Sequence, residues 1–151
     1  MAINNLKRAK INSLKDICRL DLKKLEDLIK PSGFYKTKAQ YLFNLAKFIV
    51  ERDGSMARME KAELKELREK LLKLKGIGPE TADSILLYAL DKSIFVIDEY
   101  TRRLVKKHHL ADKTDYQFLQ KLFEGNLRKD YRLYQDFHAL IVINGKNLKE
   151  K

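Results

Sequence analysis

A pair of glycines around one apolar residue gives this 151-residue sequence its clearest candidate for binding chemistry. Gly76, Ile77 and Gly78 follow an apolar helical run, and Pro79 then occupies the first turn of a second helix, where its missing N–H costs nothing. Glycine tolerates φ > 0 and lets the backbone approach another molecule closely. The unpaired N–H groups that begin the second helix form an electropositive site suited to a phosphate. A plain turn between two helices would also explain the glycines.

One carboxylate, Asp98, follows a short β-branched and aromatic run at residues 93–97. We expect this run to be an extended, buried connector that delivers Asp98 to the start of the next helix. An Asp in that position most often serves only as a helix cap. The cap is compatible with catalysis, because helix N–H groups keep a carboxylate ionised. No cluster of His, Cys or Asp has the spacing of metal ligands, so no metal site is expected.

The charge balance favours a polyanionic partner. Thirty-two Lys and Arg residues against 21 Asp and Glu give a formal net charge of +11, which suits nucleic acid, although a merely solvated basic surface is an alternative. Cys18 is the only cysteine, so the sequence itself cannot form a disulfide or a thiolate cluster. The apolar runs are too short to cross a bilayer and no signal peptide opens the sequence. We therefore expect no membrane partner and a cytoplasmic location at the nucleoid.

Apolar residues recur at helical spacing along most of the chain, which predicts an all-α fold of roughly eight helices. Ser13, Asp21 and Thr114 are expected to cap three of them. A turn is expected at residues 53–55. Helices are expected at residues 61–73, before the two glycines, and at residues 131–143, near the end of the sequence.

The stretch around the glycines, Leu74-Lys75-Gly76-Ile77-Gly78-Pro79-Glu80-Thr81-Ala82, resembles the helix-hairpin-helix motif of DNA repair proteins. Lys75 replaces the usual proline of that motif. Eighteen residues after Glu80, Asp98 lies in a segment similar to the one that carries the catalytic aspartate of the endonuclease III superfamily of base-excision glycosylases, the HhH-GPD family. Arg103 matches the arginine of that segment, whereas Tyr100 stands where many members have His. Residues 32–39 and 137–146 resemble two further segments of the family.

This resemblance implies roles for the matching residues. Asp98 would be the catalytic residue that stabilises an oxocarbenium-like transition state while the bond between sugar and base breaks. Glu80 occupies the position where bifunctional members carry the lysine that enables strand cleavage, which implies a monofunctional glycosylase. The pattern is most similar to the cluster-free 3-methyladenine DNA glycosylase III type, which acts on alkylated bases. The residues expected to contact DNA are Lys75, Gly76, Ile77, Gly78, Glu80, Thr81, Arg102 and Arg103.

The resemblance also sets expectations for cofactors and partners. Iron–sulfur members carry four cysteines beyond the last matching segment, and this sequence carries none there, so no iron–sulfur cluster and no other resident cofactor is expected. Hairpin carbonyls of some members hold a monovalent cation, which this sequence permits. The expected partner is double-stranded DNA that contains a damaged base.

The family pattern further predicts how the chain is divided. Residues 1–92 would form part of a six-helix barrel that includes the hairpin at about 62–90, and residues 93–151 a second helical part that carries Asp98. The N-terminus looks truncated, because members usually have several helices before the position of Met1. The helices that start at Ser13 and Asp21 would then leave apolar faces without a partner. We expect this chain alone to be weakly active, and to self-associate or need a second polypeptide.

Two other functions stay open at this point. The chain could be a non-catalytic helix-hairpin-helix DNA-binding module or an inactive fragment, in which Asp98 has no chemical role. It could also be a helical protein–protein interaction domain whose basic surface is incidental. A steep fall of affinity with salt would separate both DNA-binding functions from the interaction domain.

Overall fold

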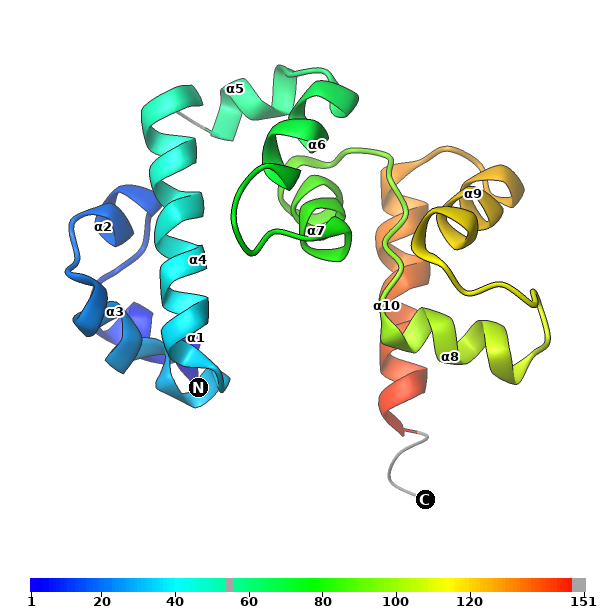
Figure 1. The fold of residues 1–151 in the computed structure, drawn as a ribbon, viewed down its shortest axis with the longest axis horizontal. Helices are drawn as coiled ribbons and strands as arrows, with labels where there is room; N and C mark the ends of the chain where they lie inside the picture. The colour runs from blue at the N-terminus through cyan, green and yellow to red at the C-terminus, as the bar shows by residue number, and fades with distance from the viewer. Residues whose placement is uncertain (54–55, 148–151) are drawn as a thin grey trace. The chain divides into compact units, whose positions relative to one another are not determined.

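The computed structural model describes residues 1–53 and 56–147, and its secondary structure within these ranges is helical, without a strand (Figure 1). The predicted all-α fold is therefore confirmed. The chain forms two compact units, which are Met1–Ala62 with Lys73–Gly76, and Glu63–Leu72 with Ile77–Lys151. The division expected after residue 92 stays a prediction. None of the helices in the described ranges combines the length and the apolar character that a membrane span requires.

In the part of the first unit that the structure describes there are five α-helices, one 3₁₀ turn and one π-helix. In chain order these are α1 (Ala2–Arg8), α2 (Leu14–Cys18), α3 (Leu22–Ile29), the 3₁₀ turn η1 (Lys30–Ser32), α4 (Tyr35–Phe48), the π-helix η2 (Ile49–Asp53) and α5 (Met56–Lys61). The expected caps are confirmed: Ser13 and Asp16 form a capping box on α2, and Asp21 Oδ1 accepts the Lys24 N–H at 2.8 Å. The turn expected at residues 53–55 lies partly outside the described residues, and Asp53 itself ends η2.

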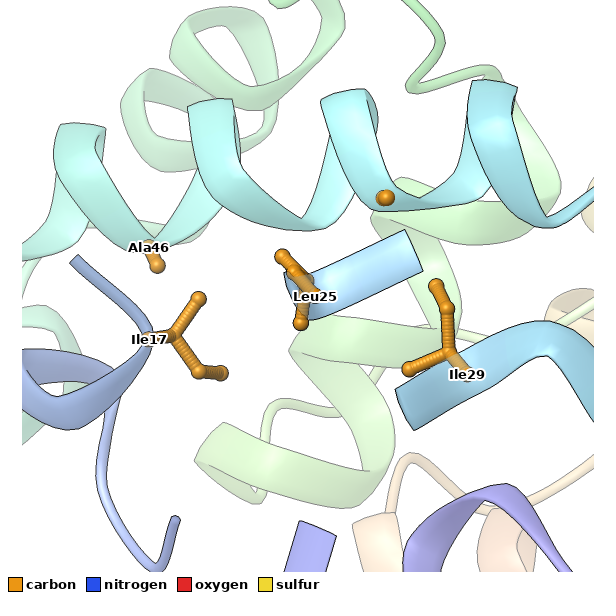
Figure 2. Close-up of a cluster of buried hydrophobic side chains, with 5 residues drawn as sticks. Ile17, Leu25, Ile29 and Ala46 are labelled. Carbon is orange, nitrogen blue, oxygen red and sulfur yellow. The ribbon is translucent and has the colours of Figure 1, made fainter. Parts of the chain in front are cut away.

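The core of the first unit lies between α4 and the helices that precede it. Figure 2 shows Ile17, Leu25 and Ile29 directed toward α4, which contributes Ala46. Leu25 and Ala46 are fully buried, and partly buried residues of α1 pack against the same cluster. The expectation that α2 and α3 leave apolar faces without a partner is therefore wrong, because α1 and α4 cover these faces within the chain itself.

The second unit consists of α6 (Leu64–Leu72), α7 (Pro79–Leu90), α8 (Glu99–Lys107), α9 (Tyr116–Asn126) and the long α10 (Tyr131–Asn147), beside which α8 and α9 lie in Figure 1. Its core contains Phe95, whose ring stacks on Phe123 at 4.6 Å and meets Tyr134 edge-on. The helix expected at residues 61–73 is divided, since Lys61 ends α5 and α6 begins at Leu64. The last helix runs four residues beyond its expected end.

One cap differs from the sequence expectation. Asp115, and not Thr114, precedes the first residue of α9, and its Oδ1 accepts the Phe118 N–H at 2.9 Å. Both residue types are good helix caps, so the sequence pattern could not distinguish two such neighbours.

Candidate active site

Asp98 is delivered by an extended segment, as the sequence predicts. The end of α7 at Asp91 adopts a left-handed conformation, and the chain then runs without regular structure to Asp98. The four residues from Ile94 to Ile97 are buried. Two side chains of α9 hold the segment by its backbone: Glu124 Oε1 accepts the Phe95 N–H at 2.8 Å, and Gln120 Nε2 donates to the Phe95 carbonyl at 2.7 Å.

A buried carboxylate connects Gln120 of α9 to α6 and α7, the two helices of the hairpin. Asp83 of α7 is fully buried and accepts two hydrogen bonds from the Arg68 guanidinium of α6, at 2.6 and 3.0 Å. Its Oδ2 also accepts from the Tyr116 hydroxyl and from Gln120 Nε2, each at 2.8 Å. Burial, followed by the charge of Asp83, raises the pKa of Tyr116, so its hydroxyl stays a donor. Asp83 and Gln120 together thus join α6, α7 and α9 to the segment that precedes Asp98.

Asp98 is the N-cap of α8 and is held on one side by Thr101. Its Oδ1 accepts the Thr101 N–H at 2.8 Å and the Thr101 hydroxyl at 2.9 Å. The side chain is 14% exposed. Burial alone would raise the pKa of Asp98, but His138 and the two Thr101 donors outweigh it, so the net pKa is lowered and the carboxylate is ionised at neutral pH.

The other carboxylate oxygen, Oδ2, faces a histidine that sequence reasoning did not include in the site. His138 of α10 is buried, and its Nε2 lies 3.5 Å from Asp98 Oδ2 without forming a hydrogen bond to any described residue. Its Nδ1 lies 2.7 Å from the hydroxyl of Tyr88 on α7. A buried histidine on the apolar face of a helix usually has local hydrogen-bond partners at both ring nitrogens. Here only one ring nitrogen is hydrogen-bonded.

Glu80 lies in the first turn of α7 and is exposed. Partial desolvation, and then the negative charge of Asp98, raise the pKa of Glu80. The negative charge of Asp98 therefore acts on the Glu80 carboxylate. The position that the resemblance assigns to a lysine thus holds an acid that cannot act as an amine nucleophile.

The hairpin glycines have different conformations. Gly76 has φ +88°, and a Cβ at this position would overlap the ring of Tyr41 within the first unit. Gly78 is the N-cap of α7 with φ −88°, and nothing lies within 4 Å of where its Cβ would be. The expectation of φ > 0 therefore holds at Gly76 alone. The Gly78 backbone has open space beside it, and no side chain caps α7, which leaves its first N–H groups available to an anion.

The remaining residues expected to contact DNA fall into two groups. Lys75 and Thr81 are exposed, and so is Arg103, whose Nε donates to Glu99 at 2.9 Å on the same helix. Two others have side chains directed into the fold. The Ile77 side chain is buried, and Arg102 donates to the carbonyl oxygens of Thr114 and Ile97 at 3.3 and 3.5 Å. For Ile77, contact with DNA would have to be made by the backbone.

The first unit also exposes an aromatic residue that sequence reasoning did not include in the site. Phe34 precedes α4, has φ +47° and is 89% exposed. Positive φ is uncommon for a bulky residue, and a large apolar ring in water gains nothing for the fold. The ring of Phe34 is therefore accessible to another molecule.

The described side chains do not form a metal centre. Among residues 1–53 and 56–147, no three His, Cys, Asp or Glu side chains gather closely enough to hold a metal ion. Cys18 is the single cysteine of the sequence, so these residues do not fit a four-cysteine iron–sulfur cluster.

Known proteins are similar to this chain in sequence and in fold. Residues 1–129 match the model of the HhH-GPD superfamily of base excision DNA repair proteins. A protein of Methanocaldococcus jannaschii named "Putative DNA repair glycosylase" is 44% identical over 153 residues, which cover 99% of this chain and 70% of that protein. Endonuclease III of Sulfolobus acidocaldarius is 27% identical over 83% of this chain and 54% of its own length.

Two solved structures extend the comparison. The H. pylori 3-methyladenine DNA glycosylase MagIII, bound to 1,N6-ethenoadenine, superposes with a TM-score of 0.87 and 34% identity, covering 97% of this chain and 75% of that one. An endonuclease III in a non-covalent complex with DNA shares the fold with a TM-score of 0.68, at 21% identity over 83% of this chain and 57% of that one. This chain belongs to the HhH-GPD superfamily of base excision DNA repair glycosylases.

Proposed function

We propose that this chain removes an alkylated base from DNA by hydrolysis of the N-glycosidic bond and leaves an abasic site. The observation that carries the proposal is the geometry of Asp98, an ionised and half-enclosed carboxylate that is fixed through one oxygen and has the other directed away from its cap. The alkylated substrate class is supported by similarity to a 3-methyladenine DNA glycosylase.

The proposed chemistry needs one fixed negative charge. As the bond between C1′ and the base nitrogen breaks, its electron pair leaves with the base and positive charge develops on the sugar. Asp98 stabilises that charge, and its Oδ2 accepts a proton from the water whose oxygen attacks C1′. Thr101 keeps Oδ1 occupied, so Oδ2 is the oxygen that acts.

Glu80 makes the proposed enzyme monofunctional. Strand cleavage by the lyase route requires an amine that attacks C1′ and forms a Schiff base. A carboxylate at the start of α7 supplies no such amine. Burial, and then the negative charge of Asp98, raise the pKa of Glu80, which disfavours a role for Glu80 as a second anion at the sugar.

We propose that the DNA backbone is bound by the N-terminus of α7, where Gly78 provides space, together with exposed cations such as Lys75 and Arg103. Phe34 is suited to insert between bases, since an apolar wedge repays part of the unstacking cost. A monovalent cation at the hairpin carbonyls, a nucleoid location, and self-association or a second polypeptide stay predictions.

The test is single-turnover release of a methylated purine from duplex DNA, run in parallel with binding to the same duplex across a salt series. Base release together with a steep negative slope of log K against log salt supports the proposal. Salt-dependent binding without base release would support a non-catalytic DNA-binding module. A flat salt dependence would indicate a protein–protein interaction domain instead.

A further inference from the structure

A chain of three polar side chains from three helices ends at the outer oxygen of Asp98. Tyr88 comes from α7, His138 from α10 and Asp98 from the start of α8. The Tyr88 hydroxyl lies 2.7 Å from His138 Nδ1, and His138 Nε2 lies 3.5 Å from Asp98 Oδ2. All three residues belong to the second unit. The arrangement is therefore a property of one compact body.

The imidazole is held in one orientation. The His138 side chain is 9% exposed, and the ring of Phe95 meets it edge-on at 6.2 Å with an interplanar angle of 86°. Its Nε2 is buried and has no hydrogen-bond partner among the described residues. A buried polar nitrogen without a partner costs free energy. Such a cost is expected where a buried nitrogen serves a functional neighbour. The charged group that faces Nε2 is Asp98.

The hydroxyl of Tyr88 is the hydrogen-bond partner of His138 Nδ1. It has two acceptors within reach, His138 Nδ1 at 2.7 Å and the Gln135 carbonyl oxygen at 3.4 Å. When the hydroxyl donates to Nδ1, the proton of a neutral ring is carried by Nε2. This tautomer places an N–H on the nitrogen that lies 3.5 Å from Asp98 Oδ2, and it adds no positive charge beside a sugar that becomes cationic. An imidazolium would oppose that charge.

We propose that His138 is a positioning residue for Asp98, and that Tyr88 fixes its Nε2–H tautomer so that the imidazole orients the acting carboxylate oxygen. This inference rests on the proposed function, because it assigns chemistry to Asp98. Thr101 fixes Oδ1 through two hydrogen bonds. His138 restrains Oδ2 but leaves this oxygen able to contact the attacking water. The 3.5 Å separation leaves the contact weak enough for Oδ2 to accept a proton from water as well.

The first test measures the tautomer directly. In the full chain labelled with ¹⁵N and free of DNA, the ring-nitrogen shifts of His138 at pH about 7.5 distinguish the two neutral forms. We expect a protonated Nε2 and an unprotonated, hydrogen-bonded Nδ1 that loses its hydrogen bond in Tyr88→Phe. A proton on Nδ1, or an imidazolium at this pH, would overturn the proposal.

The second test follows Asp98. In His138→Phe, the ¹³C carboxyl titration of Asp98 should shift to higher pH, and single-turnover base release should fall by about two- to tenfold, the range for the loss of a weak polar contact. His138→Gln retains an N–H near the position of Nε2 and should restore most of both. Tyr88→Phe should cost about two- to tenfold in rate. The other charged groups near the trio, Glu80, Glu99, Arg102 and Asp136, are unchanged in all variants.

Matched controls separate this role from stability and from the proposed function. Tyr131→Phe on α10 removes a hydroxyl that is bonded only to the neighbouring Arg132 among the described residues, and should leave the rate unchanged. If His138→Phe fails to fold, the half-exposed Tyr88 keeps the test available. Wild-type rates and an unshifted Asp98 titration in folded variants would refute the inference alone. Full activity of Asp98→Asn would refute the proposed function as well.

Discussion

Replacing Asp98 with Asn separates the charge of this residue from its role as a helix cap. In the structure Oδ1 accepts both Thr101 donors, and an amide oxygen can accept the same two hydrogen bonds. Asn and Asp are about equally good N-caps, so the free energy of unfolding should change by less than about 0.5 kcal/mol. Asp98→Ala removes the acceptor as well, and should destabilise by about 1 kcal/mol, within a usual range of about 0.5–2 kcal/mol.

The expected effect on chemistry is much larger. A fixed group directed at charge that develops in the transition state contributes on the order of 10²–10³ in rate, and Asp98→Asn keeps the geometry while it removes the charge. Base release should therefore fall at least a hundredfold in both variants, although only Asp98→Ala is measurably destabilised. Affinity for duplex DNA should be equal or slightly higher, because one negative charge near the phosphates is lost.

The assay is single-turnover release of a methylated purine with enzyme in excess, accompanied by urea unfolding and by fluorescence anisotropy on duplex DNA. Enzyme excess keeps product release from limiting the measured rate. Release by Asp98→Asn at the rate of the unchanged chain would refute the catalytic assignment. Loss of activity only in Asp98→Ala would show that the cap, and not the charge, is what base release requires.

Four further outcomes are expected. Borohydride should trap no covalent adduct between the unchanged chain and DNA, whereas Glu80→Lys should produce one, because it places an amine at the start of α7. Gly78→Ala should keep the fold and weaken DNA binding, whereas Gly76→Ala should lower the free energy of unfolding by about 1–2 kcal/mol, since alanine is strained at φ +88°. Phe34→Ser should leave unfolding unchanged and slow base release, because the 89% exposed ring contributes no burial. The lowered pKa of Asp98 means that its stabilising contribution is present above the unfolded pKa and is lost as pH falls through the folded one. The difference in unfolding free energy between the unchanged chain and Asp98→Ala should thus stay constant from about pH 8 to 5 and shrink only below the ordinary value of 3.8.

Several features could be predicted from the sequence because they depend only on residues that are close along the chain. Ser13 and Asp21 are caps because their short side chains reach the first free N–H groups of the next helix, whatever the rest of the fold does. The buried connector before Asp98 is equally local, since a run of apolar and β-branched residues between two helices has no other stable environment than the core. The hairpin and Asp98 carry the family resemblance for the same reason, because both depend on spacing along the chain.

Other features depend on which helices meet, and spacing along the chain does not contain that information. The guanidinium of Arg102 donates to two backbone carbonyls that the fold brings beside α8, while contact of this residue with DNA stays a prediction. The covered faces of α2 and α3 follow from the packing of α4, which lies further along the sequence.

The trio of Tyr88, His138 and Asp98 is the clearest case of tertiary determination. Its members are separated by ten and forty positions along the sequence and come from three elements. A tyrosine on a partly exposed helix face and a histidine on an apolar one are each ordinary by themselves. They come together, with one hydrogen bond between Tyr88 and His138 and a 3.5 Å approach of His138 to Asp98, only because α7, α8 and α10 pack in one body. Side-chain distances of a few ångströms are set by helix packing and not by sequence spacing.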